Sequence, residues 1–208
     1  PLTDKHKPIH MLTCYDFQTA QLLNNTNLDL ILVGESLGNV ILGHETTVEV
    51  TIEEMKIFSA AVKEGAPQKF VVADMPFGSY STFDKAIENA IELFQYSKAE
   101  AVKLEGSNEL NIKIVQRLTE IGIPVMGHIG LMPQSVHAQG GYFKHGKTEA
   151  DKLRLIKEAL DLEQAGCFAV VLECVEETTA HQISLDLNIP TIGIGSGEKC
   201  NGQVLVLN

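Results

Sequence analysis

Basic side chains are scarce in this sequence. It has 16 Lys and Arg against 27 Asp and Glu, which gives a formal net charge of −11. A nucleic-acid-binding domain usually carries a basic stripe, and a protein that binds anionic lipid needs basic clusters. The composition therefore argues against nucleic acid and against a membrane surface as partners, and solubility is a sufficient reason for the acidity.

The sequence also lacks the features of secreted and membrane proteins. Its cysteines, at positions 14, 167, 174 and 200, show no zinc-knuckle or Cys-x-x-Cys spacing. Cys14, Cys167 and Cys174 stand in apolar surroundings, where reduced and buried thiols are usual. The first residues contain no apolar signal-peptide core, and no apolar run approaches the length of a membrane span. These absences favour a reducing, cytoplasmic location.

What the sequence does have is an ordinary globular composition, 44% hydrophobic and 21% charged over 208 residues. That length favours one domain over residues 1–208, with a sizeable core.

Four apolar runs each end in an acidic residue. Leu30–Val33 has the pattern of a strand buried on both faces, and Gly34, Glu35 and Ser36 follow it at once. The same design recurs at Phe70–Asp74, Ala101–Glu105 and Phe168–Glu173. Each run therefore places a carboxylate at the edge of the core.

Strand-like runs alternate with helical stretches along the whole chain. We expect strands at His10–Cys14, Leu30–Val33, Phe70–Asp74, Ala101–Glu105, Val125–His128, Phe168–Glu173, Thr191–Ile194 and Val204–Leu207. We expect helices near Phe17–Asn25, from an N-cap at Thr51 to Glu64, and over Thr82–Lys98, Asn108–Ile121, Thr148–Ala165 and Glu176–Leu187. Thr51 and Glu54 have the spacing of a capping box. A long polar loop is expected over Ser36–Val50, and a Gly-rich stretch over Ile129–Gly146 interrupts the alternation.

This alternation predicts a (β/α)8 barrel, the TIM barrel, with a doubly wound open sheet as the alternative. Only Ser196–Gln203 separates the last two strands, which is too short for a crossover helix. No helical stretch follows Val204–Leu207, so we expect the barrel to lack its carboxyl-terminal helix.

In either architecture the ligand site lies at the carboxyl ends of the strands. Glu35, Asp74, Glu105 and Glu173 would converge there. A hard divalent cation such as Mg²⁺ would relieve their mutual repulsion. The alternative is that some of these acids cap helices or pair with basic residues.

Two further residues could act at this edge. Lys103 shares a strand face with Glu105, so it could supply positive charge to a carboxylate or an oxyanion, or simply pair with Glu105. His128 could polarise a substrate oxygen, orient a neighbouring acid, or be a satisfied core histidine. The glycines of Gly193–Gly197 could cradle a phosphate or only permit close packing.

An ordered series of motifs carries a resemblance to one family. The motifs are Val33–Gly38, Gly43–Thr47, Ala73–Phe77, Val102–Gly106, Gly127–Ser135, Leu172–Val175 and Ile192–Gly195. Together, from about Leu12 to Val206, they resemble ketopantoate hydroxymethyltransferase, also called 3-methyl-2-oxobutanoate hydroxymethyltransferase. The resemblance implies a barrel of the phosphoenolpyruvate/pyruvate superfamily that makes ketopantoate, for pantothenate synthesis, from 2-oxoisovalerate and 5,10-methylenetetrahydrofolate. It also implies Mg²⁺ as cofactor and a homo-oligomer, commonly a decamer.

The resemblance assigns roles to the matching positions. Glu35, Asp74 and Glu105 would bind the metal; Glu35, Ser36, Asp74 and Lys103 would bind the oxo acid; Glu173 would be the proton acceptor. His128 could support these side chains. Chelation by Mg²⁺ would stabilise the enolate that forms when a base removes the C3 proton. The family usually has Asp where this chain has Glu35, so we expect a bound metal with one ligand altered. The family also continues beyond Asn208 with a closing helix.

Two other functions stay open at this point. One is a different Mg²⁺-dependent enzyme of the same superfamily, a lyase or mutase acting on oxo acids. The other is a non-catalytic binding or assembly protein that kept the barrel. Exchange of the C3 proton of 2-oxoisovalerate with deuterated water, with Mg²⁺ and without folate, separates the three functions.

Overall fold

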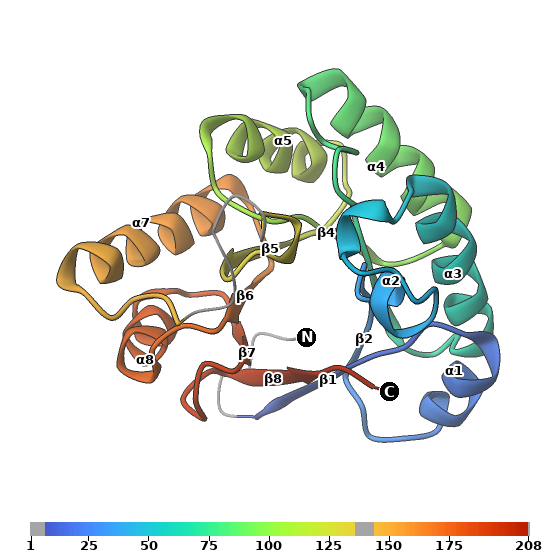
Figure 1. The fold of residues 1–208 in the computed structure, drawn as a ribbon, viewed down its shortest axis with the longest axis horizontal. Helices are drawn as coiled ribbons and strands as arrows, with labels where there is room; N and C mark the ends of the chain where they lie inside the picture. Colours follow the sequence, from blue (N-terminus) through green and yellow to red (C-terminus); the bar gives the residue numbers. More distant parts are fainter. Residues whose placement is uncertain (1–6, 136–143, 208) are drawn as a thin grey trace.

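Parallel strands form one closed barrel in the computed structural model, which describes residues 7–135 and 144–207 (Figure 1). The strands are β1 (Ile9–Thr13), β2 (Leu30–Val33), β3 (Phe70–Asp74), β4 (Ala101–Lys103), β5 (Val125–Gly130), β6 (Ala169–Glu173), β7 (Thr191–Ile194) and β8 (Gly202–Leu205). Each strand pairs with its neighbours in sequence, and β8 pairs with β1 to close the barrel. The predicted (β/α)8 barrel is confirmed, and the doubly wound alternative is wrong.

Helices follow one another around the outside of this barrel (Figure 1). They are α1 (Phe17–Asn24), α2 (Leu37–Val40), α3 (Ile52–Gly65), α4 (Phe83–Ser97), α5 (Glu109–Glu120), α7 (Glu149–Ala165) and α8 (Glu177–Asp186), with 3-10 helices η1 (Thr47–Glu49) and η2 (Pro133–Ser135). Within the described residues no helix lies between β7 and β8, as the short spacing predicts, and none follows β8. Residues 136–143 of the Gly-rich stretch lie outside the described part of the chain.

Local sequence signals explain where several helices begin. The Thr51 hydroxyl accepts a hydrogen bond from the Glu54 amide at 3.2 Å, and the Glu54 carboxylate accepts one from the Thr51 amide at 2.8 Å. This capping box at the start of α3 confirms the prediction. The side chains of Asn108 and Thr148 cap α5 and α7 by accepting one backbone N–H each, without a reciprocal bond, whereas Thr82 precedes α4 without a capping bond from its side chain.

Some expected boundaries are wrong. Ser36–Val50 contains α2 and η1, so it is not simply a loop. The last strand begins at Gly202 and not at Val204, because a Cβ at Gly202 would lie 2.6 Å from the carbonyl oxygen of Ile9 and only glycine allows β1 to approach so closely. Because glycine has no apolar side chain, the apolar pattern of the sequence does not indicate that the strand begins at this position.

The cysteines are all free, as their spacing predicts. Cys14 and Cys167 are buried, and burial raises the pKa of the Cys167 thiol to about 12. Cys174 is only half-buried, which corrects the expectation for that residue.

The core has two layers because successive side chains of a strand point to opposite sides. Met11, Leu30, Val72 and Val171 belong to the cluster inside the barrel. Residues between them in sequence, such as Ile31, belong to the larger cluster between the strands and the helices. Both faces of the strands are therefore apolar, as expected for a parallel sheet covered by helices.

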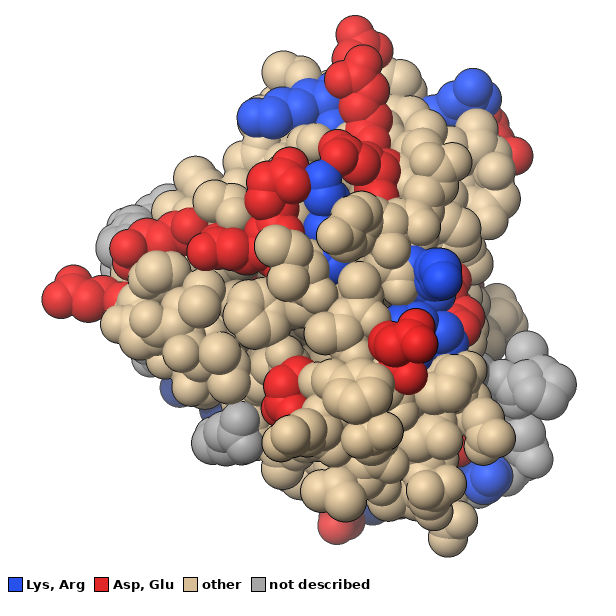
Figure 2. All heavy atoms as spheres, turned by 90° about the vertical axis from the view of Figure 1, so that its right-hand side faces the viewer, with Lys and Arg blue, Asp and Glu red and all other residues tan. Residues whose placement is uncertain are grey.

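Charged side chains on the surface are mixed in sign. On the face that Figure 2 shows, acidic and basic side chains lie in small groups among other residues. Within residues 7–135 and 144–207, no helix has the length and apolar character needed to cross a bilayer.

Candidate active site

The alternating direction of side chains along each strand explains why the polar residues of the site point into the barrel. Val72 and Ala101 point into the barrel, so Asp74 and Lys103, two positions further on, point the same way. By the same rule Met126 is followed by His128 on β5, and Val171 by Glu173 on β6. Because all strands are parallel, these side chains meet at one end of the barrel, at the carboxyl ends of the strands.

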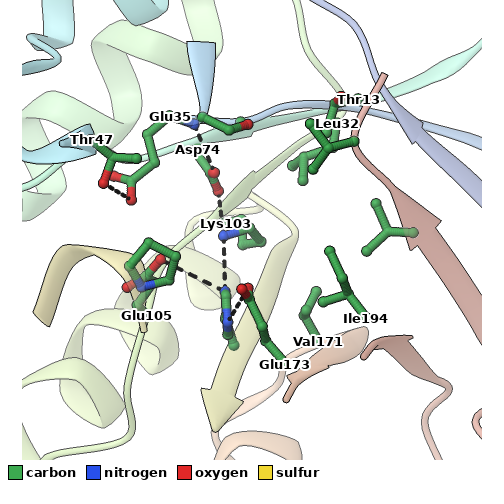
Figure 3. Close-up of a pocket in the computed structure, with 16 residues that line it drawn as sticks. Thr13, Leu32, Glu35, Thr47, Asp74, Lys103, Glu105, Val171, Glu173 and Ile194 are labelled. Atoms are coloured by element: carbon green, nitrogen blue, oxygen red, sulfur yellow. Dashed lines mark hydrogen bonds and ion pairs between the residues drawn. The ribbon is translucent and has the colours of Figure 1, made fainter. Parts of the chain in front are cut away.

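A cavity of about 110 Å³ opens between them, with a polar and an apolar side (Figure 3). Glu35, Asp74, Lys103, Glu105 and Glu173 lie around the polar side. Leu32, Val171 and Ile194 lie on the apolar side, and Val204 and Val206 also line the cavity. The cavity can therefore hold a small molecule with one charged end and one aliphatic end.

Lys103 and Asp74 form a buried ion pair. Lys103 Nζ lies 2.6 Å from Asp74 Oδ1, and each residue is 3% exposed. Burial favours the neutral amine, but Asp74, Glu105 and Glu35 together outweigh it and raise the pKa of Lys103 to about 12. The ammonium is therefore fixed in its charged form. The predicted alternative partner, Glu105, contributes to this stabilisation, but the direct contact is with Asp74.

His128 links Lys103 to Glu173. Its Nε2 lies 2.8 Å from the carbonyl oxygen of Leu131 and 3.3 Å from Glu173 Oε2. Both oxygens are hydrogen-bond acceptors, so Nε2 carries the proton. Its Nδ1 lies 3.3 Å from Lys103 Nζ, which can only donate. The hydrogen-bond network thus assigns the Nε2–H tautomer, and His128 holds the side chains of Lys103 and Glu173 in place.

Glu35 is held from two sides. Its amide donates to Asp74 Oδ2 at 3.2 Å, and its Oε1 accepts a hydrogen bond from the Thr47 hydroxyl at 2.9 Å. Its Oε2 is buried and has no hydrogen-bond partner among the described residues. Burial, and then the charges of Glu105 and Asp74, raise the pKa of Glu35 well above its usual range.

Glu105 sits against the loop that follows β5. Its Oε2 accepts a hydrogen bond from the Gln134 amide at 3.2 Å, and its carbonyl oxygen accepts one from Asn111 at 2.7 Å. Burial raises the pKa of Glu105, and the charge of the neighbouring Lys103 only partly opposes this effect.

The donor set suits a hard divalent cation. Glu35, Asp74 and Glu105 all offer carboxylate oxygens, which Mg²⁺ prefers, and the unpartnered Glu35 Oε2 is an oxygen that calls for a cation or a proton. Among the described residues, no three His, Cys, Asp or Glu side chains already stand at the spacing of metal ligands. The chemistry of these residues therefore fits Mg²⁺, and binding would require their side chains to adjust.

Every predicted site residue lines this cavity, but the sequence did not indicate their partners. Glu35, Ser36, Asp74, Lys103, Glu105, His128 and Glu173 are all lining residues. Tyr15, whose hydroxyl lies 2.7 Å from Ser36 Oγ, and Thr47 were missed. Tyr15 directly follows the first predicted strand, and Thr47 ends the Gly43–Thr47 motif, but neither position indicated which side chain it contacts.

Gly193–Gly197 serves packing in this structure. Ser196 is fully buried, and its hydroxyl donates to the carbonyl oxygen of Leu172 at 2.7 Å. A Cβ at Gly197 would lie 2.4 Å from Glu177 Cγ. The close-packing interpretation of these glycines is therefore the better one.

A closed (β/α)8 barrel with charged residues at the carboxyl ends of its strands defines the class of TIM-barrel enzymes. Solved structures agree on this fold. A 2,3-dimethylmalate lyase superposes with a TM-score of 0.72 at 15% identity, covering 98% of this chain and 75% of that chain. A phosphonopyruvate hydrolase in complex with oxalate and Mg²⁺ gives 0.74 at 10% identity, covering 98% and 77%.

Sequence comparison identifies the family within this class. The model of the family described as ketopantoate hydroxymethyltransferase matches residues 2–208. The 3-methyl-2-oxobutanoate hydroxymethyltransferase of Thermotoga maritima is 54% identical, covering 95% of this chain and 73% of that protein. The proteins of the same name from Trichodesmium erythraeum and Leptospira interrogans are 50% and 47% identical, covering 98% and 96% of this chain and 78% and 76% of those proteins. The chain belongs to the ketopantoate hydroxymethyltransferase family and is a transferase enzyme.

Proposed function

We propose that this protein transfers a hydroxymethyl group to C3 of 3-methyl-2-oxobutanoate, which is 2-oxoisovalerate. The one-carbon donor is 5,10-methylenetetrahydrofolate, and the product is 2-dehydropantoate, that is ketopantoate, for pantothenate synthesis. With one water consumed, the donor becomes tetrahydrofolate and the reaction balances. The names of the relatives support the oxo acid as substrate.

The observation that carries this proposal is the two-sided cavity. A cavity of about 110 Å³ suits a small oxo acid. The ammonium of Lys103 has three N–H donors, and Asp74 and His128 engage two of them. The third is available for the substrate carboxylate or oxo group, and the apolar side accepts the isopropyl group.

Glu173 is the base in this proposal. Its side chain is 18% exposed, so it is the most accessible of the acids described above, and His128 Nε2 holds one of its oxygens at 3.3 Å. The C3–H bond breaks, the proton passes to the Glu173 carboxylate, the electron pair becomes the C2–C3 double bond, and the carbonyl π pair moves to the 2-oxo oxygen to give the enolate. The consumed water breaks both C–N bonds that hold the one-carbon unit on the donor and releases it at the oxidation level of formaldehyde, leaving tetrahydrofolate. C3 attacks this carbon and forms the new carbon–carbon bond, and the oxygen that came from water takes up a proton and becomes the hydroxyl group.

Glu35, Asp74 and Glu105 are the residues that would hold Mg²⁺, which would act as a Lewis acid toward the 2-oxo group. Lys103 adds a fixed positive charge next to them. Ser36, whose hydroxyl is held by the Tyr15 hydroxyl, also lines the cavity and would offer its hydroxyl to the oxo acid.

A direct assay tests the proposal. The protein is mixed with the oxo acid, 5,10-methylenetetrahydrofolate and Mg²⁺, and the new hydroxymethyl group is followed by NMR. We expect 2-dehydropantoate to accumulate. Turnover of a different oxo acid instead would favour a lyase or mutase, and ligand binding without any turnover would favour a non-catalytic protein.

A further inference from the structure

The two oxygens of Glu35 stand in different environments. Oε1 accepts the hydrogen bond from Thr47 Oγ1 at 2.9 Å, whereas Oε2 is buried and has no hydrogen-bond partner among the described residues. Glu35 is 3% and Thr47 8% exposed, so water does not compete freely for either group. One oxygen is therefore fixed by the protein, and the other is left for something else.

The chain that follows β2 is folded so that Thr47 reaches Glu35. The Gly38 amide donates to the Glu35 carbonyl at 2.9 Å, and the His44 amide donates to the Gly38 carbonyl at 2.8 Å. A Cβ at Gly38 would lie 2.6 Å from Val50 Cγ2, so glycine lets α2 and η1 pack closely. This packing places the first residue of η1 over the end of β2.

A glutamate needs such a restraint more than an aspartate does. It has one additional rotatable bond, and Asp74 and Glu105 repel its charge from the polar side of the cavity. Without a bond to the protein, the carboxylate would be free to turn away from the other two acids.

We propose that Thr47 is a positioning residue for the metal site: its hydroxyl holds Oε1 of Glu35 so that Oε2 faces the divalent cation. This inference rests on the proposed function, because Mg²⁺ is part of that proposal. It adds Thr47 to the residues that act at the metal site and gives the two carboxylate oxygens of Glu35 different roles. Hydrogen-bond partners of metal ligands commonly matter about 10–100-fold in metal affinity.

Calorimetric titration of the full chain with Mg²⁺ alone tests this role. Thr47→Val keeps the shape of the side chain and removes the donor, and we expect Mg²⁺ affinity to fall about 10–100-fold. Thr47→Ser retains a hydroxyl and should bind nearly as well as the parent. Thr46→Val is the matched control, because Thr46 makes no capping bond from its side chain and is the neighbouring threonine.

A second background separates positioning from general damage to the fold. Glu35→Asp shortens the side chain by about 1.5 Å, which takes the carboxylate out of hydrogen-bond range of Thr47. We expect Thr47→Val to change Mg²⁺ affinity less than about threefold in this background. An equal loss in both backgrounds, or parent-like affinity in Thr47→Val, would overturn the inference and leave the proposed function standing. A parent protein that binds no Mg²⁺ would overturn both.

Discussion

At the scale of single residues, the site is a chain of contacts in which each charged group has a defined neighbour. Asp74 contacts Lys103, Lys103 contacts His128, and His128 contacts Glu173. Asp74, Glu105 and Glu35 together raise the pKa of the lysine. The roles proposed for these residues can therefore be tested by replacing one member at a time.

Replacing Lys103 separates substrate binding from a purely structural ion pair. Lys103→Met should lower the affinity for 3-methyl-2-oxobutanoate by about 1.5–3 kcal/mol, the contribution of a charged hydrogen bond. It should also lower the free energy of unfolding by about 3–5 kcal/mol, because Asp74 is left buried without its partner. Calorimetry and denaturant titration measure the two effects.

Lys56→Met is the control for this variant. Lys56 is also buried, but it pairs with Glu53 and Glu92, which lie on α3 and α4 and do not line the cavity. It should lose stability without losing affinity for the oxo acid. If Lys103→Met binds the oxo acid as tightly as the parent, Lys103 has only a structural role.

At the scale of elements, the contact between β5 and β6 sets the position of Glu173. Gly130 pairs with Glu173 in the ladder, and the Leu131 amide donates to the Glu173 carbonyl at 2.8 Å. Gly130 has φ +95°, and a Cβ there would lie 2.3 Å from the Glu173 carbonyl oxygen. Only glycine satisfies both conditions.

Gly130→Ala should therefore displace Glu173 as well as strain the backbone. Gly122→Ala is the matched control, since Gly122 has φ +93° but open space around its Cβ position. The control should cost about 1–3 kcal/mol of stability from backbone strain alone, and Gly130→Ala should cost about 1–3 kcal/mol more from the clash. Only Gly130→Ala should slow C3 proton exchange; equal exchange rates in the two variants would contradict this account.

The elements also show where sequence reasoning succeeds. Leu30–Val33, Phe70–Asp74 and Thr191–Ile194 match their predicted bounds because an apolar run buried on both faces is a strong local signal. The acids at their ends could be predicted as site residues because parallel strands bring their carboxyl ends together. The eighth strand was predicted at Val204–Leu207 and lies at Gly202–Leu205, so its bounds are wrong, because Gly202 is required by its close approach to Ile9, which is distant in sequence.

The supporting residues of the site were beyond the reach of local patterns. Thr47 becomes a partner of Glu35 only after the chain folds back over β2. Tyr15 reaches Ser36 only across the β1–β2 pair. The direct lining residues could therefore be predicted, whereas the residues that orient them depend on tertiary contacts.

At the scale of the whole molecule, the buried acids make stability depend on pH. The pKa of Glu35 is raised in the folded protein, mainly by burial, so the folded state binds more protons than the unfolded state above pH of about 4.3, the ordinary value of a glutamate. Stability contributed by the protonated group is therefore present at lower pH and is lost as pH rises through the raised pKa.

Glu35→Gln removes this dependence because its amide stays neutral. In EDTA, we expect the difference in Tm between Glu35→Gln and the parent to grow in favour of the variant from pH 4 to pH 8. Each kcal/mol would appear as about 2–4 °C for a chain of this size. Added Mg²⁺ at pH 8 should stabilise the parent more than the variant. A difference in Tm that does not change with pH would show that Glu35 is not a destabilising buried charge.

The central claim is that Glu173 removes the C3 proton of a 2-oxo acid in this cavity, and one exchange measurement tests it most directly. 3-Methyl-2-oxobutanoate is incubated in deuterated water with Mg²⁺ and without folate, and loss of the C3 proton signal is followed by NMR for the parent and for Glu173→Gln. We predict exchange in the parent, slowed about 10²–10⁴-fold in the variant, with oxo acid affinity nearly unchanged. No exchange in the parent, or exchange at the parental rate in Glu173→Gln, would contradict the account.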